Sequence, residues 1–201
     1  IKNEFIKRFL SSIILIPVSF IFIIKGSIFL NFFLIICFLI TVNEWFNMIK
    51  KNLIKFIGLI FLIFSFYSIY KIRNDFDRDF LYLLFVLITC VSTDIGGYVF
   101  GNIFGGPKLI KISPNKTYSG SVGSYIFSFI FSYFFLVFEN IDYSIKILIL
   151  VFFVSTISQI GDILISYFKR LSKIKDTGKI IPGHGGLLDR IDGMIFAFPF
   201  S

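Results

Sequence analysis

The sequence has few of the residues that soluble enzymes use for chemistry or for a water-facing surface. Only 16% of its 201 residues are charged and 56% are hydrophobic, so a soluble domain has no means of burying its apolar surface. A single histidine excludes a histidine-rich metal site. Cys37 and Cys90 each stand alone in an apolar run, which argues against a disulfide or a zinc site. The chain has no soluble domain with a basic face, so nucleic acid is not an expected partner.

Charged residues divide the remaining sequence into apolar segments. Six complete segments lie near Phe9–Ile24, Ser27–Phe46, Phe56–Tyr70, Phe80–Phe100, Val122–Phe138 and Ile145–Phe168, and another starts after Arg190. A helix needs roughly 20 residues to cross about 30 Å of hydrocarbon. The period-two alternation of barrel strands is absent. We therefore predict an all-α, polytopic integral membrane helical bundle with about six to seven transmembrane helices.

We expect this bundle to be a single transmembrane domain over residues 1–201, with N-terminal spans over about 1–80 and a catalytic half over about 80–201. Counted loop by loop, 15 of the 20 Lys and Arg residues fall on one side, which the positive-inside rule makes cytoplasmic. The net charge of +8 is equally compatible with attraction to anionic lipid head groups. Glu44 and Trp45, at the cytoplasmic end of the second segment, are expected at the membrane interface.

The longest polar stretch runs from Ser166 to Asp192 and begins with cations. These are Lys169, Arg170, Lys173, Lys175 and Lys179. Arg and Lys bind phosphate oxygens through charge-assisted hydrogen bonds. A Pro-Gly-His-Gly-Gly turn follows, in which glycine tolerates the positive φ angles of an anion-binding backbone. The stretch therefore predicts a site for nucleotide phosphates, with His184 as a phosphate contact or as simple turn packing.

Acidic residues accompany these cations. Asp162, Ser166 and Lys169 share a helix face at i, i+4 and i+7, and Asp189 and Asp192 share another at i, i+3. An ionisable group within a membrane span is costly, so each calls for a functional reason. Carboxylates from two helices suit a pair of metal ions that hold phosphate oxygens. The alternative is an internal ion pair between Asp162 and one of the cations that follow it.

A second polar block precedes the fifth segment. Asp94, Tyr98 and Gly101 share a helix face at i, i+4 and i+7, which suits a polar ligand at the membrane boundary. An Asp that caps a helix or bonds between helices is the alternative. Lys116 and Thr117 stand just ahead of a predicted helix start, where anion sites form. The spacing differs from that of a Walker loop, so the block alone does not identify a nucleotide-binding site.

The run from Ser166 to Asp192 resembles the signature of the phosphatidate cytidylyltransferases, the CDP-diacylglycerol synthases. The signature reads Ser, two residues, Lys-Arg, four residues, Lys-Asp, then Pro-Gly-His-Gly-Gly, two residues and Asp-Arg-x-Asp, and each position is filled. The segment Asp94–Gly106 and residues 113–120 are similar to the other polar block of that family. The resemblance covers the C-terminal half by motif and the N-terminal spans only by hydropathy.

This resemblance implies conversion of CTP and phosphatidate to CDP-diacylglycerol and pyrophosphate. It also implies a Mg²⁺-dependent homodimer embedded among lipids, with a second monovalent or divalent cation as a further possibility. The expected location is the bacterial inner (plasma) membrane, with cytoplasmic active-site loops. The implied catalytic residues are Asp162, Lys169, Arg170, Lys175, His184, Asp189, Arg190 and Asp192, of which Asp162, Asp189 and Asp192 hold the metal. The implied substrate-binding residues are Asp94, Tyr98, Ser113, Lys116, Thr117, Ser166, Gly185 and Gly186.

Two other functions use similar features. A CTP-dependent lipid or polyprenol kinase needs the same phosphate-binding groups but transfers the γ-phosphoryl group. A small membrane transporter also has intramembrane acids, although the internal repeat of many transporters is not evident. The CDP-alcohol phosphotransferases fit less well, because their Asp-Gly-x-x-Ala-Arg block is absent and the chain has a single alanine, Ala197.

Overall fold

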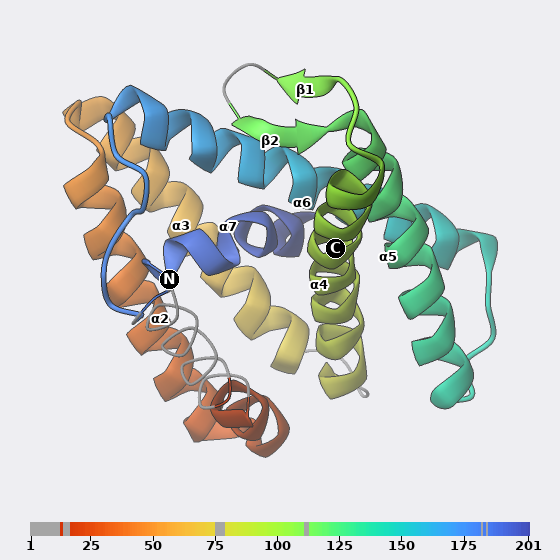
Figure 1. Ribbon diagram of the computed structural model, residues 1–201. Coiled ribbons are helices and arrows are strands. Elements are labelled where there is room, and N and C mark those ends of the chain that lie inside the picture. The colour runs from red at the N-terminus through yellow and green to blue at the C-terminus, as the bar shows by residue number, and fades with distance from the viewer. Residues whose placement is uncertain (1–12, 14–16, 75–78, 111–112, 182, 184) are drawn as a thin grey trace. The chain divides into compact units, whose positions relative to one another are not determined.

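The computed structural model describes residues 13, 17–74, 79–110, 113–181, 183 and 185–201. Apart from one short hairpin, the secondary structure of these residues is helical (Figure 1). The helices are α2 (Ser27–Met48), α3 (Asn52–Asn74), α4 (Asp79–Phe104), α5 (Tyr118–Phe138), α6 (Ile145–Leu171) and α7 (Leu188–Ala197), followed by a 3-10 turn at Phe198–Phe200. Residues 17–25 are helical too. The hairpin pairs β1 (Lys108–Ile110) with β2 (Ser113–Thr117).

Five of the described helices are long and apolar enough to cross a membrane. They cover Ile28–Met48, Asn52–Asn74, Phe80–Phe104, Tyr118–Phe138 and Ile145–Leu171. Each contains one of the predicted apolar segments or nearly all of it, which confirms the prediction of an all-α polytopic membrane protein. The helices run past the apolar segments into polar residues, because a helix once formed gains a hydrogen bond with each added residue.

The first and the last of the predicted apolar segments compare differently with the structure. The first segment, near Phe9–Ile24, lies largely outside the described residues. The last helix, α7, begins at Leu188 and so takes in Asp189 and Arg190, whereas the sequence predicted a start after Arg190. The earlier start follows from capping, because backbone N–H groups at the beginning of α7 find carboxylate acceptors.

The described residues group into two compact units. Unit 1 consists of the described part of Ile1–Phe80 together with Phe168–Ile191, and unit 2 consists of Leu81–Tyr167 and Asp192–Ser201. In unit 1, α2 packs against α3, and the rings of Phe38 and Phe66 meet edge to face with centroids 5.5 Å apart. That the chain forms one transmembrane domain stays a prediction.

Trp45 in unit 1 corrects the expectation of an interfacial aromatic residue. Its side chain is buried, with 6% of its surface exposed. The indole N–H donates to the carbonyl oxygen of Lys55 at 3.3 Å, and the ring packs edge-on against Phe168 with centroids 5.1 Å apart. Gly58 permits this burial, because a Cβ atom at that position would collide with the indole. Trp45 therefore packs inside unit 1 instead of lying in a lipid-facing belt.

In unit 2, polar contacts between α4, α5 and α6 add to an apolar cluster of Phe85, Leu136 and Val151. Three pairs of hydroxyl groups join these helices, namely Thr89 with Ser132 at 3.0 Å, Thr93 with Ser155 at 3.0 Å, and Tyr125 with Thr156 at 2.9 Å. Hydroxyl groups of this kind hydrogen-bond across helices in a bilayer, where no water is present to satisfy them. These contacts hold α4, α5 and α6 side by side, and α4 and α6 carry the acidic residues Asp94 and Asp162.

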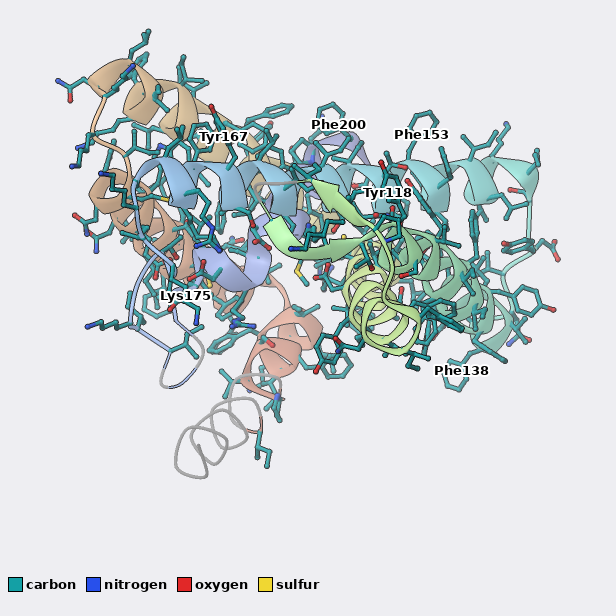
Figure 2. All side chains as sticks on the ribbon, turned by 45° about the horizontal axis from the view of Figure 1, so that its top comes forward. Tyr118, Phe138, Phe153, Tyr167, Lys175 and Phe200 are labelled. Atoms are coloured by element: carbon teal, nitrogen blue, oxygen red, sulfur yellow. The ribbon has the colours of Figure 1, made fainter. Side chains whose placement is uncertain are left out.

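The outer surface of unit 2 is apolar and aromatic. Phe138 on α5 has 81% of its surface exposed and Phe153 on α6 has 53%, and both side chains project away from their helices (Figure 2). In water such exposure would be unfavourable, whereas hydrocarbon tails solvate these rings. This apolar surface agrees with the lengths of the helices, which also indicate a membrane protein.

Small residues allow α4 and α5 to approach closely. A Cβ atom at Gly123 would meet the Phe100 side chain and would lie 2.8 Å from the carbonyl oxygen of Gly96. Nearby, the Ser124 hydroxyl donates to the carbonyl oxygen of Thr93 at 2.8 Å. Close crossings of membrane helices commonly use small residues in this way.

The substitution Gly123→Ala tests this crossing. The added methyl group has no space, so we expect the free energy of unfolding to fall by about 1 to 3 kcal/mol. Thermal unfolding in detergent micelles measures the change, with Val122→Ala on the exposed side of α5 as the control. An unchanged melting temperature for Gly123→Ala would contradict the close packing.

Candidate functional site

A polar pocket of about 230 Å³ lies within unit 2, lined by residues of the hairpin, α4, α5 and α6. Its charged lining residues are Asp94, Lys116 and Asp162, and Tyr98, Thr117 and Gln159 contribute further polar groups. The hairpin was not predicted from the sequence. It brings Lys116 to the pocket by pairing β2 antiparallel with β1, with Thr117 opposite Lys108.

Lys116 and Asp162 form an ion pair inside this pocket. The Lys116 and Asp162 side chains are 23% and 30% exposed, so a ligand in the pocket can reach both. The Ser166 hydroxyl donates to the other oxygen of Asp162 at 3.4 Å, which confirms the predicted helix face shared by these two residues. The alternative ion pair was expected with a cation that follows Asp162 on the chain. That expectation is wrong, because the partner comes from β2.

The beginning of α5 adjoins the pocket. Thr117 is its N-cap residue, and its hydroxyl oxygen accepts a hydrogen bond from the N–H of Gly120 at 3.1 Å. Such a cap satisfies one of the free N–H groups of a helix start. The predicted helix start after Lys116 is confirmed, and the capping hydroxyl of Thr117 is already engaged. A role for Thr117 in binding substrate stays a prediction.

In unit 1, Asp189 accepts hydrogen bonds at both of its carboxylate oxygens. Lys169 Nζ lies 2.8 Å from Oδ1, while Oδ2 accepts from the Thr177 N–H at 2.8 Å, the Thr177 hydroxyl at 3.1 Å and the Gly186 N–H at 3.1 Å. Burial alone would raise the pKa of Asp189. The hydrogen bonds from Lys169, Thr177 and Gly186 outweigh burial and lower that pKa below its ordinary value. Asp189 is therefore an anion at neutral pH.

Glu44 is the functional candidate that the sequence did not reveal. It was expected at the interface, but only 2% of its surface is exposed and its carboxylate binds both the loop before α7 and the first residue of α7. The N–H groups of Leu187 and Leu188 donate to it at 3.0 and 2.8 Å, and the Thr177 hydroxyl donates at 3.0 Å. The one signal in the sequence was an acid inside an apolar segment, which in a membrane requires a partner.

The glycine turn folds back on itself. Ile181 and Gly185 exchange two backbone hydrogen bonds of 3.0 and 3.1 Å. Gly183 and Gly185 have φ angles of 77° and 94°, as predicted for this turn. The N–H groups of Gly185 and Gly186 already donate within the protein, so an anion would compete with those acceptors. His184 lies outside the described residues.

The remaining predicted residues lie in several places. Arg170, Lys175 and Arg190 are exposed, and Figure 2 shows Lys175 on the loop that follows α6. Ser113 begins β2 and is not among the residues that line the pocket. Asp192 is buried in unit 2, where its carboxylate accepts from the Gly193 N–H at 2.9 Å.

The predicted metal ligands belong to different units, with Asp162 and Asp192 in unit 2 and Asp189 in unit 1. Within the part of the chain that the structure describes, no group of three or more His, Cys, Asp or Glu residues is arranged to hold a metal ion. A metal held jointly by the three acids thus stays a prediction.

Comparison with known proteins bears on the whole C-terminal part of the chain. A sequence profile described as the cytidylyltransferase family matches residues 52–201. Similar proteins named phosphatidate cytidylyltransferase occur in Staphylococcus saprophyticus (36% identity over 163 residues), Staphylococcus haemolyticus (37% over 163) and Brucella suis (37% over 141). The alignments cover 77% of this chain and 62% of each staphylococcal relative, and 70% of this chain and 52% of the Brucella relative.

The chain therefore spans less than two thirds of the length of these relatives. The profile match nevertheless covers most of the chain and includes both the pocket of unit 2 and the residues around Asp189. On this evidence the chain belongs to the cytidylyltransferase family.

Proposed function

We propose that the protein is a phosphatidate cytidylyltransferase, which converts CTP and phosphatidate to CDP-diacylglycerol and pyrophosphate. The observation that carries the proposal is the Lys116–Asp162 ion pair in a pocket that Asp94 also lines. A cation and two carboxylates in one accessible pocket suit a ligand that combines phosphate groups with a metal ion. The relatives that carry the name phosphatidate cytidylyltransferase support the same reaction.

The reaction needs little covalent chemistry from the protein. An oxygen of the lipid phosphate, already anionic, attacks the α-phosphorus of CTP. The new P–O bond forms as the bond between the α-phosphorus and the bridging oxygen breaks, and pyrophosphate leaves with that oxygen. No general base is required, so catalysis depends on alignment and on neutralising charge.

Cations of the chain supply that neutralisation. Lys116 is paired with Asp162 yet remains partly exposed, so a phosphate entering the pocket competes with Asp162 for its ammonium group. Arg170 and Lys175 are exposed, so their charged groups are accessible to a phosphate. Lys169 differs from them, because it is held by Asp189 at 2.8 Å. In this proposal the exposed cations bind phosphate and departing pyrophosphate, and Lys169 orders the residues around Asp189.

Mg²⁺ fits the carboxylates of the unit 2 pocket better than it fits Asp189. Mg²⁺ takes oxygen ligands, keeps several waters and is commonly held by one or two carboxylates together with substrate phosphates. Asp94 and Asp162 offer such oxygens in one pocket, where the described partners of Asp162 are Lys116 and, through a long hydrogen bond, Ser166. Asp189 instead accepts four hydrogen bonds at its two oxygens. When bound, Mg²⁺ neutralises negative charge on the phosphates. Participation of Asp189, Asp192 or a second cation remains part of the prediction from sequence.

The cellular setting of this proposal follows from charge and composition. The helices of the chain are apolar enough for membrane insertion, and the relatives named above are bacterial. With 15 of the 20 Lys and Arg residues on one side, we place the polar loops in the cytoplasm and the protein in the inner (plasma) membrane. Homodimer formation and contacts with membrane lipids belong to the proposal as well.

The position of a radioactive label tests the reaction. Membranes containing the protein are incubated with phosphatidate, Mg²⁺ and CTP labelled at either the α- or the γ-phosphate, and the lipid is extracted. We expect the α-label in the lipid and the γ-label in pyrophosphate, because the lipid phosphate attacks the α-phosphorus. Entry of the γ-label into lipid would show a kinase instead, and lipid free of both labels would favour a transporter.

The substitution Lys116→Ala tests the pocket. Loss of a group that stabilises developing charge typically lowers kcat about 10²- to 10³-fold, and we expect a loss of that size here. Lys146→Ala, which removes an exposed lysine at the start of α6, is the matched control and should leave kcat unchanged. Steady-state kinetics on membranes with equal amounts of inserted protein provide the measurement. Equal activity of the two variants would remove the pocket from the proposal.

A further inference from the structure

Glu44 lies outside the residues that match the family profile. Among the acids described in unit 1, it contacts the residues that are farthest from it along the sequence. Its Oε1 atom accepts from the Leu187 N–H, and its Oε2 atom accepts from the Leu188 N–H and the Thr177 hydroxyl. The three hydrogen bonds link the end of α2 to both sides of the glycine turn. A single side chain thus fixes the loop at its entrance and at its exit.

Two glycines make room for this carboxylate. A Cβ atom at Gly178 would lie 2.6 Å from Glu44 Oε1, and one at Gly186 would lie 2.5 Å from Glu44 Oε2. Contacts this short are not tolerated between a real Cβ atom and a carboxylate held on both sides. The loop backbone therefore packs directly onto Glu44, which explains the need for glycine at both positions.

The Glu44 carboxylate also acts on α7 and on Asp189. It satisfies N–H groups at the start of α7, where a negative charge is favourable. The single proton of the Thr177 hydroxyl lies between Glu44 and Asp189 and is shared by the two carboxylates, since the hydroxyl oxygen lies 3.0 Å from Glu44 and 3.1 Å from Asp189. Asp189 in turn holds Lys169 at 2.8 Å. A chain of polar contacts therefore runs from Glu44 through Thr177 and Asp189 to Lys169.

We propose that Glu44 is a positioning residue for the transferase reaction, an inference that rests on the function proposed above. Glu44 does not touch substrate. It holds Thr177 ahead of the glycine turn and Leu187 and Leu188 after it, so that Asp189 and Lys169 are fixed and the exposed Lys175 and Lys179 are presented to the triphosphate of CTP. Small displacements of groups that align reactants lower reaction rates steeply.

The substitution Glu44→Gln tests this role. Glutamine keeps the size of the side chain but replaces one acceptor oxygen with an NH₂ group, which cannot accept from Leu187 or Leu188. We expect the backbone amides of Thr177 and of residues 185–188 to exchange hydrogen about tenfold faster and kcat to fall about tenfold or more. Glu44→Asp, which keeps both acceptor oxygens, should recover part of the loss. Glu139→Gln at the end of α5 is the matched control.

The measurements are hydrogen exchange by mass spectrometry, and kcat and KM for CTP per amount of folded protein. Thr177→Val, which removes the hydroxyl between the two carboxylates, covers the case in which Glu44→Gln does not fold, and it should lower kcat as well. A purely structural role predicts less folded protein with unchanged kcat and KM.

Two results for Glu44→Gln would overturn the inference: unchanged hydrogen exchange, or faster exchange with unchanged kcat and KM. Neither result affects the proposed function as long as the wild-type protein is active. A wild-type protein without transferase activity would reject the proposed function, and positioning for that reaction with it. In that case the exchange rates still show whether Glu44 anchors the loop.

Discussion

A lipid bilayer offers no water to polar groups, so each polar group within the membrane must find a partner inside the protein. This requirement shapes both units. In unit 2, hydroxyl groups of α4, α5 and α6 pair with one another, for example Thr93 with Ser155. Glycines such as Gly123 let α4 and α5 come close enough for these contacts. The same helices carry Asp94 and Asp162, so the packing that satisfies the hydroxyls also sets the walls of the polar pocket.

In unit 1 the same requirement produces a different result. Glu44 lies near the end of an apolar helix, and its carboxylate is satisfied by N–H groups and a hydroxyl of a segment that is more than one hundred residues away in the sequence. The buried acid thus stabilises the loop that carries the exposed Lys173, Lys175 and Lys179.

The sequence predicted those features that composition or local spacing determines. The lengths of the apolar segments predicted the membrane-spanning helices, because the thickness of the bilayer sets the length of such a segment. The Asp162–Ser166 face followed from helical periodicity, and the positive φ of Gly183 followed from the chemistry of glycine. Partner choice was not predictable. Lys116 reaches Asp162 because it lies on a hairpin whose residues show no clear sequence pattern for strands. The burial of Glu44 depends on contacts between segments that are distant in the sequence. Residue spacing carries no information on such contacts.

The proposed activity of this family member is transfer of a cytidylyl group to an acidic lipid. Its most direct test is the stoichiometry of the purified protein in lipid vesicles that contain phosphatidate, with Mg²⁺ and CTP added. We expect one CDP-diacylglycerol, identified by mass spectrometry, and one pyrophosphate for each CTP consumed. Formation of CDP together with a newly phosphorylated lipid, or no change in the lipid while CTP stays intact, would contradict the proposed activity.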